Sequence, residues 1–467
     1  MLAFVILLLV AAGVADRRDR GSGSAVSTLD AQQPVVAASS ARSSAWYCAG
    51  ATGTPNGNAA GTVVVANIGH GRLHGTVSVM PSEGPTDVRP IEVAPAAQSF
   101  MRLEYPKPTP WLGAIVELDG GQAGVEMVTS GPRGDSVTPC ASSVSSAWYF
   151  AEGVTTKDAT EVLTLFNPFP EDAIVDIAFT TEEGETTPDA LSGLAVAGRS
   201  VKAVNVGEFV QRREGVTSAV TARAGRLVVE RFQSFDGSAG RRGMTMALGS
   251  PAAESQWYFP EGLVADGLAE RYQIFNPGAQ ESEVALSFSP ESGESEPLNL
   301  TIPPHRRVSV AANDETRIPR GVPHAVTVES TNDVGVVVER TVDGGPPSGR
   351  VGVAMTRGAT GTALSWLLTV GRTDDVVEEW VAVLNPGTRA ARVSILLFSD
   401  GNRVPVDKLQ NLEVAAGQRR AFRLAGTVRP GTTPLVVTST AAVVVERDLY
   451  AVRGASFNMV VGFPLKP

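Results

Sequence analysis

A tryptophan-centred string returns four times along the chain at nearly constant intervals. It reads WYFAEG at Trp148 and WYFPEG at Trp257, with weaker copies WYCAG at Trp46 and WLLTVG at Trp366. The last three tryptophans are 109 residues apart, and the first two are 102 apart. A catalytic motif is normally used once per chain, whereas self-similarity at a fixed period indicates a repeat architecture. The chain is therefore expected to contain four copies of one unit.

Two further landmarks keep their order and spacing relative to the tryptophans. An apolar run ends in asparagine in every copy, and a valine-rich run ends in glutamate, followed by arginine in copies two to four (VVER). The asparagines are Asn67, Asn167, Asn276 and Asn385, and the glutamates are Glu126, Glu230, Glu339 and Glu446. The landmarks place the copies at residues 45–141, 142–250, 251–359 and 360–467.

Each copy is expected to be an independent β-rich unit. A length of about 109 residues lies in the commonest range of domain sizes, so one copy can bury its own core. Short segments in which apolar and polar residues alternate, such as residues 161–166 and 173–179, predict half-buried strands. The expected fold is all-β, with four tandem immunoglobulin-like β-sandwich modules of about six or seven strands. The alternative is a closed ring or propeller-like array in which sheets pair across copy boundaries.

The N-terminal end has an apolar run typical of a signal peptide or a membrane anchor. Residues 2–14 are an uninterrupted apolar run that is too short to cross a bilayer comfortably. We expect a signal peptide or membrane anchor over residues 1–15, followed by a disordered linker over residues 16–44, which are rich in Gly, Ser and Ala. The expected location is extracellular or at the cell surface, with the N-terminus as an anchor if it is retained.

Charge and cysteine content restrict the partners and the redox compartment. A net charge of −10 argues against nucleic-acid binding, which needs a basic face. The two cysteines, Cys48 and Cys140, bracket the first copy. In an exported protein we expect them to form a disulfide, which in the chain-entropy model stabilises a loop of this length by roughly 4–5 kcal/mol.

The repeated acids are the main candidates for chemistry. Glu152 and Glu261 stand in the tryptophan strings, and the four valine-rich runs supply one glutamate each. Paired carboxylates can hydrolyse glycosides. However, a semi-buried glutamate needs a partner, so we expect these glutamates to bond turn amides or an arginine such as Arg231 of a neighbouring copy. The tryptophans, asparagines and glutamates are therefore interpreted as structural landmarks.

No other motif identifies a catalytic, cofactor or metal site. His70 and His74 stand four residues apart in a glycine-rich turn with no third ligand near them, which is a weak metal signal. The sequence contains no G-x-S-x-G elbow, no P-loop and no dinucleotide-binding fingerprint. We therefore assign no catalytic, cofactor-binding or metal-binding residues and expect no cofactor.

The WYFAEG string, the FNP turn and the VVER strand resemble a family of exported bacterial repeat proteins, mostly actinobacterial, that is classed as a domain of unknown function. The resemblance covers about residues 45–467 and is closest in copies two and three. It implies β-rich modules and an envelope or extracellular location, and it carries over no catalytic residues. Copy one departs from the pattern at its Asn-Pro and VVER positions and adds the cysteines.

Three functions are compatible with these observations. The leading hypothesis is a non-enzymatic exported cell-surface protein whose modules form a stalk or interaction scaffold. The first alternative is a protein that binds cell-wall glycan, and the second is a glycan-processing enzyme that uses the repeated glutamates. The expected partners are a cell-envelope protein or wall glycan, with membrane contact through the N-terminal segment.

Overall fold

The computed structural model describes residues 33–54, 56–291, 295–399, 401–431 and 434–466. Its regular structure is almost entirely antiparallel strand, interrupted by four short 3-10 turns, which confirms the predicted all-β class. The predicted N-terminal segment, residues 1–15, lies outside the described residues, as do residues 16–32 of the predicted linker. Within the described ranges, no helix is long and apolar enough to cross a membrane.

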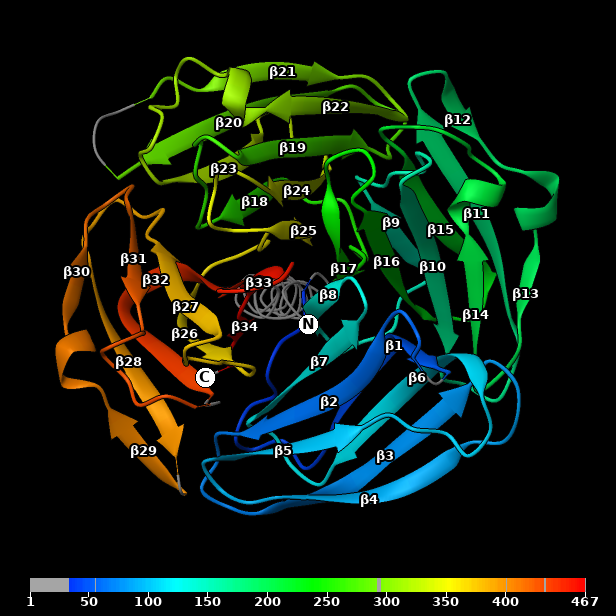
Figure 1. The fold of residues 1–467 in the computed structure, drawn as a ribbon, viewed down its shortest axis with the longest axis horizontal. Coiled ribbons are helices and arrows are strands. Elements are labelled where there is room, and N and C mark those ends of the chain that lie inside the picture. The colour runs from blue at the N-terminus through cyan, green and yellow to red at the C-terminus, as the bar shows by residue number, and fades with distance from the viewer. Residues whose placement is uncertain (1–32, 55, 292–294, 400, 432–433, 467) are drawn as a thin grey trace, which may run out of the picture.

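Each copy, here called module 1 to module 4, contains two antiparallel sheets packed face to face (Figure 1). In module 1 the sheets have the orders β1-β6-β3-β4 and β5-β2-β7-β8. Its strands are β1 (Ser44–Gly53), β2 (Ala60–Asn67), β3 (Leu73–Pro81), β4 (Asp87–Val93), β5 (Ala97–Arg102), β6 (Thr109–Leu118), β7 (Ala123–Gly131) and β8 (Gly134–Pro139).

Modules 2 and 3 repeat this pairing. In module 2 the orders are β12-β11-β15-β9 and β14-β10-β16-β17, and in module 3 they are β18-β23-β20-β21 and β22-β19-β24-β25. The elements of module 2 are β9 (Ala147–Phe150), β10 (Ala159–Asn167), β11 (Ala173–Thr181), β12 (Gly184–Thr186), η1 (Asp189–Leu191), β13 (Leu194–Val196), β14 (Ser200–Asn205), η2 (Val206–Glu208), β15 (Thr217–Ala224), β16 (Val228–Asp236) and β17 (Arg242–Leu248). Those of module 3 are β18 (Gln256–Phe259), β19 (Leu268–Asn276), β20 (Ser282–Pro290), β21 (Leu298–Ile302), β22 (Arg306–Ala311), η3 (Ala312–Asp314), β23 (His324–Ser330), β24 (Val337–Gly344) and β25 (Gly352–Arg357).

Module 4 differs in one long strand, β32, which runs through both of its sheets. Its first half pairs with β26 and β28, and its second half pairs with β27 and β33. The elements of module 4 are β26 (Ala363–Leu368), β27 (Val377–Leu384), β28 (Ala391–Ser399), β29 (Asn402–Pro405), η4 (Asp407–Leu409), β30 (Leu412–Val414), β31 (Arg419–Arg423), β32 (Leu435–Ala451), β33 (Phe457–Val461) and β34 (Phe463–Pro464).

The four modules close into a ring, so the extended arrangement expected for a stalk is wrong (Figure 1). One strand of each module, β8, β17, β25 or β33, lies next to the ring axis, and neighbouring axial strands contact each other. Side chains join them: the Met246 N–H donates to Ser136 Oγ over 2.9 Å, and the Val137 N–H donates to Asn458 Oδ1 over 2.9 Å. The named sheets stay within their modules, so the cross-boundary sheets of the alternative prediction do not form. The ring closes through side chains and through the backbone of residues 36–37, which bonds Pro464 of module 4 and Gln122 of module 1.

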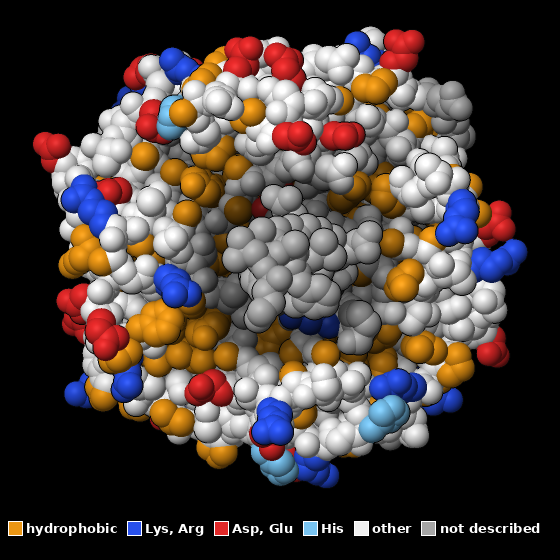
Figure 2. Space-filling model, turned by 180° about the vertical axis from the view of Figure 1, so that it is seen from behind, with side chains coloured by type: hydrophobic (Ala, Val, Ile, Leu, Met, Phe, Trp, Pro, Cys, Tyr) orange, Lys and Arg blue, Asp and Glu red, His pale blue; other side chains and the backbone are white. Residues whose placement is uncertain are grey.

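The first and last described segments of the chain pair with each other near the ring axis. The described end of the predicted linker is ordered there, which corrects the expectation of a disordered segment up to residue 44. Gln33, Val35 and Val36 are buried, and Val36 pairs with Leu465 near the C-terminal end. Gln33 Oε1 also accepts a hydrogen bond from the Thr360 N–H between modules 3 and 4. Seen from behind, hydrophobic side chains gather around this axis and charged side chains lie mainly on the periphery (Figure 2).

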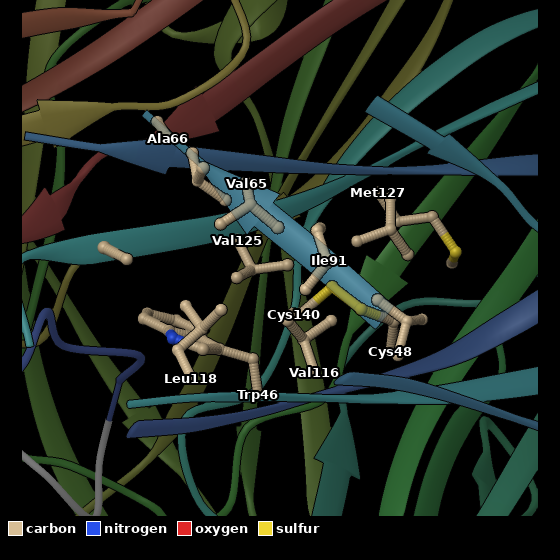
Figure 3. Close-up of a cluster of buried hydrophobic side chains, with 14 of the residues drawn as sticks. Trp46, Cys48, Val65, Ala66, Ile91, Val116, Leu118, Val125, Met127 and Cys140 are labelled. Carbon is tan, nitrogen blue, oxygen red and sulfur yellow. A yellow bond between two sulfur atoms is a disulfide. The ribbon is translucent and has the colours of Figure 1, made fainter. Parts of the chain in front are cut away.

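The disulfide between Cys48 and Cys140 forms, and it lies in the core of module 1 (Figure 3). Both cysteines are completely buried, among Val65, Val116 and Val125. Cys48 belongs to β1 and Cys140 follows β8, so the bond joins the first strand of the module to its exit.

The tryptophans and asparagines of the four copies occupy equivalent places. All four tryptophans are buried, and three of them donate an indole N–H to the backbone carbonyl at the equivalent position of their own module: Trp148 to Leu227, Trp257 to Val336 and Trp366 to Val443. Every repeated asparagine bonds backbone groups of the turn that follows it: Asn67 to Gly69 and Gly71, Asn167 to Phe169 and Glu171, Asn276 to Gly278 and Gln280, and Asn385 to Gly387 and Arg389. A buried Asn side chain thus fixes the same turn four times.

Candidate functional site

The repeated strings meet at the joints between modules. At three joints the strand that carries the tryptophan of one module contacts the VVER strand of the next module: β1 contacts β16, β9 contacts β24, and β18 contacts β32. The VVER residues are therefore buried on both faces of their strand. In three joints a glutamate of that strand accepts a backbone N–H from the preceding module. The bonds run from Ala49 to Glu230, from Glu152 to Glu339 and from Val370 to Glu126, over 2.9, 2.7 and 2.6 Å.

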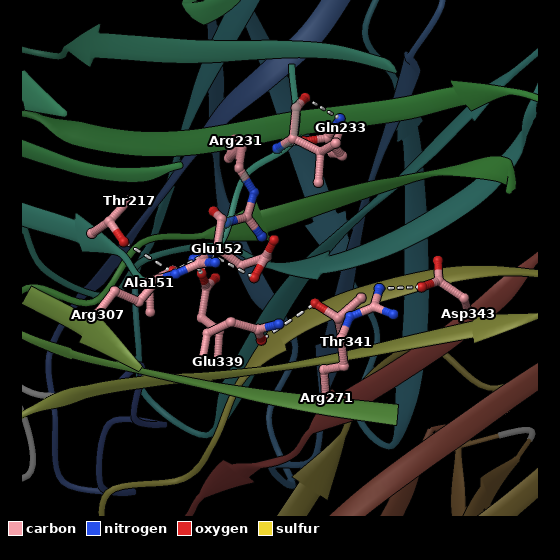
Figure 4. Close-up of polar contacts among 12 residues, drawn as sticks. Ala151, Glu152, Thr217, Arg231, Gln233, Arg271, Arg307, Glu339, Thr341 and Asp343 are labelled. Carbon is pink, nitrogen blue, oxygen red and sulfur yellow. Dashed lines mark hydrogen bonds and ion pairs between the residues drawn. The ribbon is translucent and has the colours of Figure 1, made fainter. Parts of the chain in front are cut away.

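The arginine of the VVER string crosses the joint in the same direction. Arg231 Nη1 lies 2.9 Å from Glu339 Oε2 (Figure 4), Arg340 pairs with Glu446, and Arg447 Nη2 lies 3.2 Å from Glu126 Oε2. All six side chains are at most 2% exposed. Removing one partner of such a buried pair would leave a charge without compensation. The Arg447–Glu126 pair joins the last module to the first and closes the ring.

The same arginines hold the tryptophan string of their own module. Arg231 Nη1 donates to the Glu152 carbonyl, and its guanidinium lies over the Phe150 ring, 5.3 Å from the centroid. Arg340 does the same with Glu261 and Phe259. The third and fifth residues of WYFAEG and WYFPEG therefore contact the buried arginine of the VVER string in the same module. This contact explains why the tryptophan string and the VVER string recur together.

The joint between modules 1 and 2 lacks this arginine. Met127 takes its place and packs into the hydrophobic core of module 1 (Figure 3). Glu230 is completely buried and accepts the Ala49 N–H, but among the described residues its Oε2 has no hydrogen-bond partner. Burial raises the pKa of Glu230 to about 8, against a partial lowering by the Ala49 amide. At neutral pH the folded protein therefore keeps this carboxyl protonated.

Replacing Glu230 by glutamine is expected to stabilise the protein by about 3 kcal/mol at pH 7, at about 1.4 kcal/mol per pKa unit between 4.5 and 7. Between pH 4.5 and 8 the folded chain keeps a proton on Glu230 that the unfolded chain has released. The wild type therefore loses stability as the pH rises through this window. Glutamine keeps the acceptor for Ala49 and does not titrate. Urea unfolding at pH 5, 7 and 8.5 measures the difference between the two profiles.

The control for this prediction is the Glu171→Gln variant, because Glu171 is an exposed glutamate of the same module. This variant should follow the wild-type pH profile. Parallel profiles for the wild type and Glu230→Gln would mean that the buried carboxyl ionises in the folded protein, which contradicts the prediction.

Glu152 and Glu261 of the tryptophan strings make a second contact across the joint. Glu152 Oε2 lies 3.1 Å from Nη1 of Arg307 in module 3, and Glu261 pairs in the same way with Arg419 in module 4. The two arginines hold equivalent positions on β22 and β31. The sequence did not predict these ion pairs, because neither arginine belongs to one of the repeated strings.

A third repeated acid also escaped the sequence analysis. Glu161, Glu270 and Glu379 each stand six residues before the repeated asparagine, and all three are buried. Glu270 lies 3.2 Å from His324 and accepts the Tyr272 hydroxyl, and Glu379 accepts the Thr373 hydroxyl. The constant offset from the asparagine was a usable signal, but module 1 carries Gly61 at this place.

Burial has the largest effect on the pKa values of the two glutamates at the joint between modules 2 and 3. It raises the pKa of Glu152 to about 7, although Arg307, Arg271 and Arg231 lower it in part. It also raises the pKa of Glu161 to about 8, against a lowering by Arg231. The site can therefore hold protons at neutral pH, and groups of this kind are often found at functional sites as well as in structural ion-pair networks.

Two joints open into clefts on the surface. The cleft between modules 2 and 3 has a volume of about 870 Å³, with Glu152 among its lining residues. The cleft between modules 3 and 4 has a volume of about 650 Å³ and includes Arg350, Arg423, Glu378 and Tyr450. Both volumes lie in the range of small-molecule sites.

The histidines do not form a metal site. His70 and His74 are exposed, and His305 lies 3.1 Å from Glu185 across the joint between modules 2 and 3. Within the described part of the chain, no group of three or more His, Cys, Asp or Glu side chains is arranged to hold a metal ion.

Comparison with known proteins gives one family and partial structural likenesses. A protein of Thermotoga maritima, described as Thermotoga maritima 1070, is 23% identical over 23% of this chain and 93% of its own, with a TM-score of 0.21. The Anabaena sensory rhodopsin transducer is 26% identical over 19% of this chain and 83% of its own, with a TM-score of 0.17. No curated protein matches the chain significantly. Residues 119–363, just over half of the chain, match DUF5719, and the chain therefore belongs to this family of unknown function.

Proposed function

We propose that this protein is a non-enzymatic scaffold of the cell envelope, a rigid ring that presents its rim and the clefts at its joints to other envelope components. The observation that supports this role best is the use of the repeated glutamates. Glu126, Glu339 and Glu446 are bound to arginines of neighbouring modules in the ring interior. A carboxylate held in a buried ion pair is committed to structure and is poorly placed to meet a substrate.

The ring form also supports a scaffold. Buried ion pairs and axial strands join all four modules, so partners bound on different modules would be held at fixed positions. A flexible string of modules with open linkers would hold them at variable distances. The apolar run at residues 2–14, expected to be a signal peptide or membrane anchor, supports a location outside the cytoplasm.

Binding of wall glycan is the second candidate, and the two polar clefts at the joints favour it. Co-sedimentation of the full chain with purified cell-wall polysaccharide separates the two functions. For a pure scaffold we expect no retention by the polysaccharide, and crosslinking on intact cells should capture a defined envelope protein in a stoichiometric complex. Retention by the polysaccharide without any protein complex would replace the scaffold by the glycan-binding function.

A further inference from the structure

The cleft between modules 2 and 3 concentrates arginine in an acidic protein. The chain carries a net charge of −10, yet six arginines line this one cleft of about 870 Å³. They are Arg212, Arg213 and Arg241 of module 2 and Arg271, Arg306 and Arg307 of module 3. On the module 2 wall, Glu152, Glu182 and Glu214 balance the three arginines, whereas the module 3 wall has no acid among its lining residues. A ligand between the walls would touch two modules at once.

Four of these arginines are already neutralised by acids. Their ion pairs are Arg307–Glu152 at 3.1 Å, Arg241–Glu214 at 2.9 Å, Arg271–Asp343 at 2.5 Å, and Arg213 with Glu182 at 2.5 Å and Glu183 at 2.6 Å. The other two, Arg212 and Arg306, are exposed and have no ion-pair partner among the described residues. These two guanidinium groups, one from each wall, are available to a ligand.

The fold holds the back of the cleft in place. A Cβ atom on Gly215 would come within 1.9 Å of Arg307 Nη2, so the absence of a side chain there lets the guanidinium lie against the backbone. Arg241 lies over the Phe235 ring, 4.5 Å from its centroid. These two arginines, each held by an acid and by its packing, therefore form the fixed back of the cleft, in front of which Arg212 and Arg306 remain available to bind.

The lining indicates the chemistry of the ligand. Guanidinium groups bind carboxylate or phosphate through paired N–H bonds. Thr181, Gln273 and Ser309 add hydroxyl and amide groups, and Glu182 and Glu214 add acceptors for ligand hydroxyls. No aromatic side chain lines the cleft among the described residues, which disfavours single-stranded nucleic acid because its bases bind by stacking. The concave shape favours a small ligand or a chain end over a folded partner.

We propose that this cleft binds a carbohydrate that carries carboxylate or phosphate groups, with Arg212 and Arg306 as the two anion ligands. The proposal names a ligand class for the glycan-binding candidate. It does not depend on the scaffold role, because it concerns purified protein and a soluble ligand, whereas the scaffold is tested on cells.

Calorimetric titration of the full chain tests the proposal with three soluble probes. They are trigalacturonic acid, a neutral trisaccharide of the same size, and glucose 6-phosphate. We expect at least one of the two anionic sugars to bind, the neutral sugar not to bind, and the affinity to fall as salt is raised. The double variant Arg212→Gln/Arg306→Gln should weaken binding at least about tenfold, since two charge-assisted hydrogen-bonding groups are lost. The anionic sugar that binds shows whether carboxylate or phosphate is the preferred group.

The double variant Arg389→Gln/Arg429→Gln is the matched control, because it removes the same charge from two exposed arginines of module 4. It should bind like the wild type, and thermal melts should show that both double variants stay folded. The proposal is overturned if neither anionic sugar binds, or if the control weakens binding as much as the cleft variant. It is also overturned if hexa-aspartate binds more tightly than both sugars, because the cleft would then serve an acidic protein segment.

Discussion

Replacing Arg231 by methionine, the residue that module 1 carries at the same place, is expected to lower the free energy of unfolding by about 3–5 kcal/mol. The guanidinium is completely buried and lies 2.9 Å from Glu339 Oε2. Its loss removes the ion pair of the buried Glu339, which keeps a longer-range electrostatic interaction with Arg357. It also removes a charge that holds down the pKa of Glu152 and Glu161. Because protonation discharges buried carboxyl groups, the loss should be larger at pH 8 than at pH 5, as measured by urea unfolding at both values.

Two variants separate charge from packing in this experiment. The double variant Arg231→Met/Glu339→Gln should recover most of the lost stability, because replacing both members of a buried ion pair is often nearly neutral. Arg223→Met breaks an exposed pair with Asp176 in the same module and should change the unfolding midpoint far less. An equal loss at both pH values without rescue by the double variant would mean that Arg231 acts through its contact with Phe150, and not through its charge.

The sequence identified the VVER residues but not how they pair. A glutamate in a valine-rich strand predicts a buried acid that needs a partner, and the expectation of an arginine from a neighbouring copy followed from this. The direction of pairing is a property of the ring. Arg231 meets Glu339 in the following module, and Glu126 meets Arg447, which lies 321 residues away in the chain. No local pattern encodes a contact that exists only because the last module returns to the first.

The strands at the joints are buried on both faces, and an alternating apolar and polar pattern does not detect such strands. Strand β11 alternates between buried and partly exposed residues, as a strand with one solvent face does, and such strands made the all-β prediction correct. Strand β16 is buried from Val228 to Phe235 on both faces, although it carries Glu230 and Arg231. A strand that is buried along its length although it carries charged and polar residues is covered by its own core on one side and by a second module on the other.

The anion-binding cleft could not be foreseen at all. Arg212 belongs to a loop of module 2, and Arg306 lies on β22 of module 3. Neither arginine recurs at its position in the other copies, so neither belongs to the repeated strings that predict the framework. A feature that depends on differences between the copies needs the placement of the modules before it can be recognised.

Module 1 leads to the second large prediction, because it lacks two of the polar contacts that the other modules have. It carries Met127 in place of the joint arginine and Gly61 in place of the third repeated acid, and it alone has the disulfide. The double variant Cys48→Ala/Cys140→Ala is expected to lose about 4–5 kcal/mol of stability, since the bond closes a loop with a sequence separation of 92. Urea unfolding without reductant measures the loss.

Comparison of the single and double variants distinguishes a crosslink from simple core packing. If the bond acts by restricting the unfolded chain, the single variants Cys48→Ala and Cys140→Ala and the double variant should lose nearly the same stability, because each lacks the same crosslink. Hydrogen exchange should then increase most in β1, β7 and β8, while β19 and β24 of module 3 stay protected. A loss that doubles from the single to the double variant would instead assign the stability to the packing of two buried side chains. In that case the disulfide would not compensate for the missing arginine and glutamate of module 1.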